Sequence, residues 1–204
     1  MKYEYNNYEY DGEDFYCYPN SNVLVNKFDI KEYGVLQQVE RDISYAKIVY
    51  LGANPILGKF NLEYMQKIHK CIFENIYGWA GKIRGGQFLF KGDSEFCHSN
   101  MIGVYADDIF NKLKNEKYLV GLKRDDFIKR LAYFMAEINV LHPFREGNGR
   151  VQRILFQELS RRAGYELDFS GVESKSLLQA DIEAYYKKFD LLIDLLNKDI
   201  VKIL

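Results

Sequence analysis

Apolar residues recur at intervals of three and four through most of the chain. This period matches the turn of an α-helix, so each run predicts an amphipathic helix with one apolar face. The runs are Val35, Val39, Ile43, Ala46 and Val49; Leu62, Met65, Ile68 and Ile72; Ile102, Tyr105, Ile109 and Leu113; Phe127, Leu131, Phe134, Ile138 and Leu141; and Val151, Leu155 and Leu159. The pattern therefore predicts an all-α fold, a helical bundle.

Helix ends and one interruption complete this outline. Asn61 is expected to cap the second helix, and Asp125 or Asp126 the fourth, because their side chains can accept hydrogen bonds from unpaired N–H groups. Gly164 suits the end of the fifth helix. At about residues 84–98 the pattern changes to glycines, aromatic residues and lysines, which predicts a loop or a short β-hairpin, here called the flap.

Length and composition favour one ordinary globular domain. The chain has 204 residues, 48% of them hydrophobic and 28% charged, and no linker or repeat divides it. We therefore expect a single domain over residues 1–204. Within it, residues 1–22 are tyrosine-rich and poorly patterned, and about residues 173–204 are expected to form C-terminal helices.

Several classes of function lose support from the composition. No apolar run could span a bilayer, and the first residues are too polar for a secretory signal, so we expect a cytoplasmic protein without a membrane role. Cys17, Cys71 and Cys97 show no paired metal-ligand spacing and fit reduced thiols. With 28 basic against 29 acidic residues there is no excess positive charge, which argues against direct binding of nucleic acid.

The most informative segment runs from His142 to Arg153 and reads His-Pro-Phe-Arg-Glu-Gly-Asn-Gly-Arg-Val-Gln-Arg. It ends one predicted helix and begins the next, which places Gly147, Asn148 and Gly149 at a helix N-terminus. Such an end offers unpaired N–H groups and partial positive charge, and glycines let the backbone approach an anion closely. A phosphate group is the natural occupant.

Four side chains of three types surround this predicted anion site. Arg150 and Arg153 lie three residues apart on one helical face, so both guanidinium groups could converge on the same phosphates. Glu146 offers a carboxylate oxygen of the kind that holds Mg²⁺ beside phosphates. His142 can act as a neutral base near neutral pH. A base, a metal ligand and an anion cradle are together the requirements of phosphoryl or nucleotidyl transfer.

The segment resembles the signature of the Fic family, His-x-Phe-x-(Asp/Glu)-Gly-Asn-Gly-Arg-x-x-Arg. Every position is matched, by His142, Phe144, Glu146, Gly147, Asn148, Gly149, Arg150 and Arg153. Weaker resemblance extends to residues 18–20, 81–84, 91–92 and 96–97. It implies the Fic fold, a helical bundle with a short β-hairpin flap beside the active site.

The resemblance also implies an activity, transfer of AMP from ATP to a serine, threonine or tyrosine hydroxyl of a target protein, with Mg²⁺ as cofactor. Each motif residue then has a role in activating the hydroxyl or holding ATP. The roles are proton removal for His142, Mg²⁺ binding for Glu146, α-phosphate contact for Gly147, Asn148 and Gly149, outer-phosphate contact for Arg150 and Arg153, and core packing for Phe144.

In the family, the flap pairs with an extended segment of the target, a form of strand addition. The matching residues are Phe88, Leu89, Phe90, Lys91 and Gly92. They differ from the small and polar residues common in the family flap, so the target preference of this chain could differ from that of other family members. A lysine on an exposed flap is also ordinary, which leaves Lys91 with a functional and a purely structural interpretation.

Two further features concern specificity and regulation. Family members that phosphorylate their targets have lysine at the position of Gly149, so the glycine favours AMP transfer. The family's inhibitory motif, Ser/Thr-x-x-x-Glu-Gly/Asn, is missing, because the chain has no threonine and no serine followed four residues later by glutamate. We therefore expect a separate inhibitory antitoxin protein, with Glu183 as the alternative internal candidate. A bacterial topoisomerase subunit is a candidate target by resemblance to toxin members.

Alternatives remain at this point. The transferred group could be UMP or phosphocholine, or the domain could be a degenerate nucleotide-binding module. An intact base beside an anion cradle argues against the binding module. His69 and His98 have no partners at metal-ligand spacing and are interpreted as structural.

Overall fold

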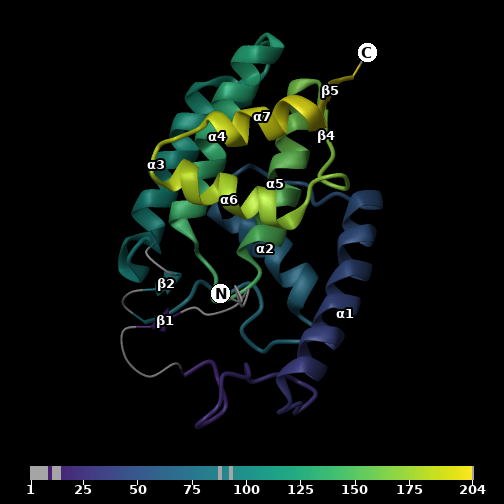
Figure 1. Cartoon of the computed structure of the whole chain (residues 1–204), viewed down its shortest axis with the longest axis vertical. Coiled ribbons are helices and arrows are strands. Elements are labelled where there is room, and N and C mark those ends of the chain that lie inside the picture. The colour runs from purple at the N-terminus through teal and green to yellow at the C-terminus, as the bar shows by residue number, and fades with distance from the viewer. Residues whose placement is uncertain (1–8, 11–14, 87–88, 92–93, 204) are drawn as a thin grey trace.

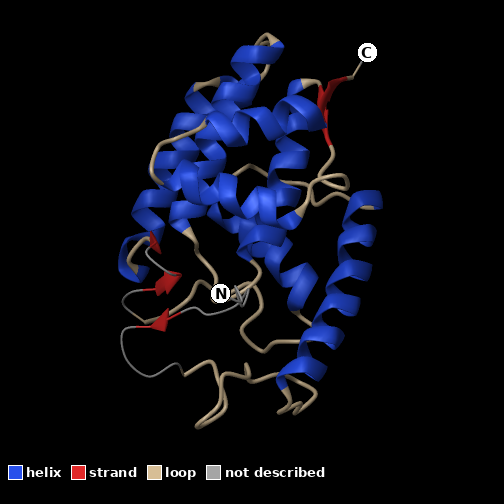
Figure 2. Cartoon of the chain, viewed as in Figure 1, coloured by secondary structure: helices blue, strands red, loops and turns tan. Residues whose placement is uncertain are grey.

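The computed structural model describes residues 9–10, 15–86, 89–91 and 94–203, and shows a helical bundle with short strands at its margins (Figures 1 and 2). The helices are α1 Tyr33–Ala53, α2 Leu62–Phe73, η1 Ser99–Met101, α3 Ile102–Asn115, η2 Lys117–Leu119, α4 Arg124–Leu141, α5 Asn148–Ala163, α6 Ser174–Tyr185 and α7 Asp190–Asp199. The strands are β1 Glu9–Tyr10, β2 Leu89–Lys91, β3 Ser94–Glu95, β4 Tyr165–Leu167 and β5 Ile200–Lys202.

The centre of the bundle is formed by α4 and α5. All five apolar residues of the run predicted for α4 are at most 1% exposed, and Val151, Leu155 and Leu159 of α5 are equally buried. Helix α5 packs against α2 and α4, while α3, α6 and α7 surround α4. The end of α4 and the start of α5 are therefore held firmly, and the loop between them, residues 142–147, carries the first half of the motif.

Helix α1 forms as predicted, but its predicted buried face is wrong. Val35 and Val49 are 44% and 56% exposed, whereas Leu36, Ser44 and Leu51 are buried. The reason is that the inward face of α1 contacts Arg150 of α5, whose guanidinium donates to Glu40 and Ser44. A pattern of apolar residues does not reveal such polar inward positions. Figure 1 shows α1 along one side of the bundle.

The predicted helix ends are confirmed in two cases and wrong in one. Asn61 caps α2 by accepting a hydrogen bond from the N–H of Tyr64 at 2.8 Å. Gly164 ends α5 in the left-handed conformation, with φ of 89°. Helix α4 instead begins after Lys123, and Asp125 and Asp126 lie within its first turn, where their charge favours the helix N-terminus without capping it.

The predicted flap is a β-hairpin, with Phe90 opposite Glu95 and Lys91 opposite Ser94. The N-terminal region that seemed poorly patterned adds a third strand, because β1 pairs antiparallel with β2. Among the described residues, β2 is therefore the central strand of the sheet, and both of its edges are paired.

The C-terminal region is helical in α6 and α7 but ends differently from the prediction. Residues 200–202 form β5, which pairs antiparallel with β4 directly after α5. The three cysteines are free thiols. Within the described ranges, no helix is long and apolar enough to cross a bilayer.

Candidate active site

His142 lies at the junction of α4 and the motif loop, in the left-handed conformation with φ of 41°. Three contacts from the base of the flap fix it there. The Nε of Arg84 donates to the carbonyl oxygen of His142 at 2.8 Å, and the N–H of Arg84 donates to the carbonyl of Pro143 at 2.9 Å. The ring of Phe96 stacks on the imidazole with centroids 3.7 Å apart. The flap and the motif loop thus form one unit.

The hydrogen bonding of His142 selects its tautomer. Its Nδ1 lies 3.2 Å from the carbonyl oxygen of Asn139. Because a carbonyl oxygen can only accept a hydrogen bond, the proton of the neutral ring belongs on Nδ1. Nε2 then carries the lone pair, as a general base requires.

Asn148 and Gly147 shape the loop at the start of α5. The side-chain amide of Asn148 bonds both backbone groups of Phe144, accepting from its N–H at 2.9 Å and donating to its carbonyl at 2.7 Å. Gly147 has φ of 81°, and a Cβ atom there would lie 2.3 Å from the ring of Phe73. The Asn148 side chain therefore braces the loop, and an anion here would meet the backbone N–H groups of the first turn of α5.

The two motif arginines differ in the contacts that they make. Arg153 extends toward the N-terminus of α5, where its Nη1 lies 3.4 Å from the position of a Cβ on Gly149. Arg150 instead turns toward α1, donating to Glu40 at 2.6 Å and to the hydroxyl of Ser44 at 3.1 Å. Arg153 therefore lies beside the first turn of α5, whereas Arg150 lies between α1 and Glu146, and phosphate binding by the two arginines stays a prediction.

Arg150 remains charged although its side chain is only 19% exposed. Burial lowers its pKa, but the carboxylates of Glu40 and Glu146 outweigh this effect and raise the pKa above its ordinary value. The guanidinium also covers the ring of Phe73, 4.6 Å from its centroid.

Glu146 is suited to hold a metal ion beside phosphates. Its side chain is 13% exposed, and its Oε1 accepts from the N–H of Gly147 at 2.8 Å and from Arg150 at 3.3 Å. Among the described residues, no three histidine, cysteine, aspartate or glutamate side chains gather as a metal cluster. A single carboxylate fits Mg²⁺, which commonly keeps waters and takes its other ligands from substrate phosphates.

His69 is structural, as expected, but it supports the motif directly. Its ring is fully buried and stacks on Phe144 with centroids 4.1 Å apart. Nδ1 accepts from the N–H of Gly81 at 2.8 Å, which leaves Nε2 to donate to the carbonyl of Glu146 at 3.1 Å. The neutral imidazole therefore joins the turn after α2 to the backbone of Glu146.

This arrangement predicts a loss of stability in mild acid. Burial, reinforced by the charge of Arg150 against the opposing hydrogen bond to Glu146, lowers the pKa of His69 from 6.5 to about 3. Below about pH 6.5 the unfolded chain binds a proton that the folded chain does not, so stability falls by about 1.4 kcal/mol per pH unit. Between about pH 7.5 and about pH 5, the His69 contribution is roughly 2 kcal/mol.

Urea unfolding at both pH values, for the wild type and for His69→Gln, measures this contribution. Glutamine retains one acceptor and one donor but cannot titrate, so the free energy of unfolding should depend less on pH in the variant. An equal dependence in both proteins would contradict the assignment of His69 as a buried neutral group.

The flap residues are placed only in part. Leu89 is fully buried, and Phe90 is partly exposed. The side chain of Leu89 therefore anchors the flap in the core. Phe88, Gly92 and the side chain of Lys91 lie outside the described residues.

Several residues at the site were missed by sequence reasoning. They hold the motif from other elements, and they are Glu40, Ser44, Tyr77, Arg84 and Phe96. Only Arg84 and Phe96 carried a signal, as parts of the weaker family resemblance. The candidate internal inhibitor, Glu183, lies on α6 and accepts a hydrogen bond from Gln179 one turn earlier, at 3.1 Å.

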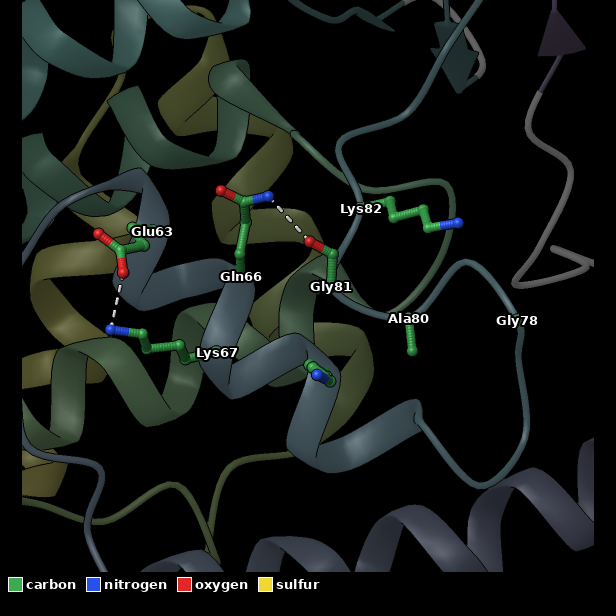
Figure 3. A pocket seen from close by; sticks show the side chains of 8 residues that line it. Glu63, Gln66, Lys67, Gly78, Ala80, Gly81 and Lys82 are labelled. Carbon is green, nitrogen blue, oxygen red and sulfur yellow. Dashed lines mark hydrogen bonds and ion pairs between the residues drawn. The ribbon is translucent and has the colours of Figure 1, made fainter.

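An open cavity of about 460 Å³ lies between α2 and the turn at residues 78–82 (Figure 3). Gln66 donates to the carbonyl of Gly81 at 2.9 Å, and Lys67 is paired with Glu63. A second cavity, of about 430 Å³, shares Gly78 and Lys82 with the first and is also lined by Phe15 and Trp79. Neither cavity is lined by residues of the motif.

Comparison with known proteins places the motif in a family. The Fic/DOC family model matches residues 59–160. The protein adenylyltransferase VbhT of Bartonella schoenbuchensis is 40% identical over 195 residues, which are 95% of this chain and 41% of VbhT. The chain thus spans less than half of VbhT. The probable protein adenylyltransferase Fic of Escherichia coli is 34% identical over 171 residues, 84% of each chain.

Solved structures agree with this result. BepC from Bartonella tribocorum, with bound AMPPNP, has a TM-score of 0.84 and 25% identity, and covers 92% of this chain and 96% of that one. The Fic domain of a Bep effector from Bartonella quintana has a TM-score of 0.83 and 30% identity, with 92% of each chain covered. The fold, the motif and these relatives together show that the chain belongs to the Fic/DOC family.

Proposed function

We propose that the chain is a protein adenylyltransferase that transfers AMP from ATP to a hydroxyl group of a target protein. The observation that carries this proposal is the hydrogen bond of His142 Nδ1 to the carbonyl of Asn139, which assigns the ring proton to Nδ1 and supports Nε2 as the base in the loop that leads into α5. Two relatives named as adenylyltransferases and a related structure with AMPPNP support the choice of nucleotide.

The proposed reaction is a single displacement at the α-phosphorus of ATP. Nε2 of His142 accepts the proton of the target hydroxyl, whose oxygen forms a bond to the α-phosphorus. The bond from that phosphorus to the bridging oxygen breaks, and pyrophosphate leaves. The N–H groups at the start of α5 and the guanidinium of Arg153 stabilise the negative charge of the phosphates by donating hydrogen bonds to their oxygens. Glu146 would hold Mg²⁺, which neutralises phosphate charge when bound.

The test is incubation of the protein with Mg²⁺, a bacterial lysate and one of four α-labelled nucleotides, ATP, GTP, UTP or CTP. Labelling of proteins from ATP alone, absent with His142→Ala, is the expected result. Labelling from UTP instead would favour UMP transfer. No labelling with any nucleotide, in folded protein free of bound inhibitor, would move weight to phosphocholine transfer or to a binding role.

The flap is the proposed docking site for the target. An extended target segment would add to an edge of the sheet and present its hydroxyl to His142. In the structure β1 pairs with the edge of β2, so a segment adding at that edge must displace residues 9–10.

This predicts that weakening β1 increases labelling of target proteins. Proline lacks the N–H that a strand ladder uses, so Glu9→Pro with Tyr10→Pro should release β1 from β2. We expect a several-fold rise in target labelling with unchanged binding of an ATP analogue, whereas prolines at Glu4 and Tyr5 serve as the control. Equal labelling by both variants and the wild type would exclude competition by β1.

Regulation is proposed to come from a second protein. The chain lacks the family's internal inhibitory motif, which favours a separate antitoxin that acts in the cytoplasm, where ATP is available. A bacterial topoisomerase subunit is the proposed first candidate among targets. Copurification with a small inhibitory protein, together with labelling of the purified topoisomerase subunit, would test these two points separately.

A further inference from the structure

Glu40 of α1 lies behind the motif and binds one of its arginines. Its Oε1 accepts from Nη2 of Arg150 at 2.6 Å, and its other carboxylate oxygen accepts from the hydroxyl of Tyr77. Ser44, one turn later on α1, accepts from Nη1 of Arg150 at 3.1 Å. The Glu40 side chain is only 15% exposed. Two successive turns of α1 thus contribute polar side chains that bind one guanidinium group.

The same guanidinium nitrogen also contacts the proposed metal ligand. Nη2 of Arg150 lies 3.3 Å from Oε1 of Glu146, compared with 2.6 Å from Glu40. The two carboxylates therefore share one donor, and the shorter contact belongs to Glu40. The N–H of Gly147 supplies a second hydrogen bond to the same oxygen of Glu146, at 2.8 Å.

The charges of this group favour a cation at Glu146. Two carboxylates and one guanidinium sum to one negative charge. Without the charge of Glu40, Arg150 and Glu146 would sum to zero, and Arg150 would be free to move fully onto Glu146. In a partly buried site this difference in net charge has a large effect on cation binding, because water screens the charges less than it does at the surface.

We propose that Glu40 is a positioning residue that acts through Arg150. Glu40 draws the guanidinium toward α1, and this leaves the Glu146 carboxylate oriented and charged to hold Mg²⁺. The inference rests on the proposed function, in which Glu146 binds the metal of MgATP. It assigns Arg150 to the orientation of Glu146 and leaves the outer phosphates to Arg153.

The test compares binding of AMPPNP by Glu40→Gln and by the wild type, using calorimetry over a series of Mg²⁺ concentrations and in EDTA. Glutamine keeps the shape of Glu40 but removes its charge. Because second-shell changes commonly cost about 10- to 100-fold in metal affinity, the Mg²⁺ concentration for half-maximal binding should rise about tenfold or more. Affinity for AMPPNP in EDTA should remain within about twofold of the wild type, since no phosphate contact is removed.

Two further variants separate this effect from a loss of fold. Glu74→Gln is the matched control, because Glu74 also pairs with α1, through Lys47, but at the surface. Glu40→Asp retains the charge and should recover most of the Mg²⁺ dependence even if Glu40→Gln is destabilised. Thermal unfolding of all four proteins identifies any variant that is not folded at the assay temperature.

Three results would overturn the inference. The first is an unchanged Mg²⁺ dependence in folded Glu40→Gln. The second is an equal loss of AMPPNP affinity in EDTA, which would mean that the network serves the phosphates. The third is failure of the wild type to bind AMPPNP at any Mg²⁺ concentration, which would overturn the proposed function as well. The first two leave wild-type binding intact and so concern Glu40 alone.

Discussion

Replacing His142 with asparagine should lower the rate of AMP transfer by about 10²- to 10⁴-fold, the usual contribution of a general base. Asparagine tolerates the left-handed conformation that residue 142 adopts, so the loop should keep its shape better than in the alanine variant. The rate is measured from the initial labelling of target proteins with α-labelled ATP.

Binding of AMPPNP and the denaturation midpoint provide the control for this variant. Binding should stay near the wild-type value, because Arg84 bonds the backbone carbonyl of residue 142 and not its side chain. The midpoint should fall only by the loss of the stacking on Phe96 and of the hydrogen bond to Asn139. If transfer continued at the wild-type rate, another group would have to accept the hydroxyl proton, and the role given to His142 would be wrong.

Replacing Gly147 with alanine should destabilise the fold by about 2–5 kcal/mol, combining the cost of a left-handed residue with that of overpacking. The added methyl group would lie 2.3 Å from the ring of Phe73, which is fully buried and so cannot move aside without disturbing the core. Transfer activity should be lost with the loop, since Gly147 precedes the first turn of α5 and donates to Glu146.

Gly121→Ala provides the matched control for this prediction. Gly121 also has a positive φ, of 85°, but a Cβ atom there meets nothing within 4 Å. It should therefore show only the backbone cost, about 1–2 kcal/mol. Urea unfolding of both variants separates the two contributions, and equal losses at the two positions would show that contact with Phe73 is unimportant.

The parts of the fold that could be predicted are those determined by local pattern. The apolar runs of α2, α3, α4 and α5 bury the predicted faces, because these helices lie against other helices along one side. The motif was predictable for the same reason. His142 to Arg153 is continuous in sequence, so its position between two helices follows from their ends.

The contacts that hold the motif could not be predicted, because they join distant elements. Glu40 and Arg150 are 110 residues apart in sequence. Nothing in the apolar pattern of α1 indicates that polar positions such as Glu40 and Ser44 face inward, and the two ends of the predicted apolar face, Val35 and Val49, are exposed. The contact of Arg150 with α1 was therefore not foreseen, and the convergence of Arg150 and Arg153 on phosphate groups stays a prediction.

The short strands were missed for a related reason. β1 consists of two residues and β5 of three, too few to show an alternating pattern. Each is defined by its partner strand, β2 or β4, and the pairing brings together segments that are distant in the chain. Strand pairing between such segments depends on the tertiary fold.

The most direct test of the central claim compares ATP labelled at the α-phosphorus with ATP labelled at the γ-phosphorus, in parallel reactions with Mg²⁺ and a bacterial lysate. Transfer of AMP predicts labelled proteins only from α-labelled ATP, since pyrophosphate carries the γ-phosphorus away. The label should disappear with His142→Asn. Labelling from γ-labelled ATP and not from α-labelled ATP would contradict the account, because it would show phosphoryl transfer.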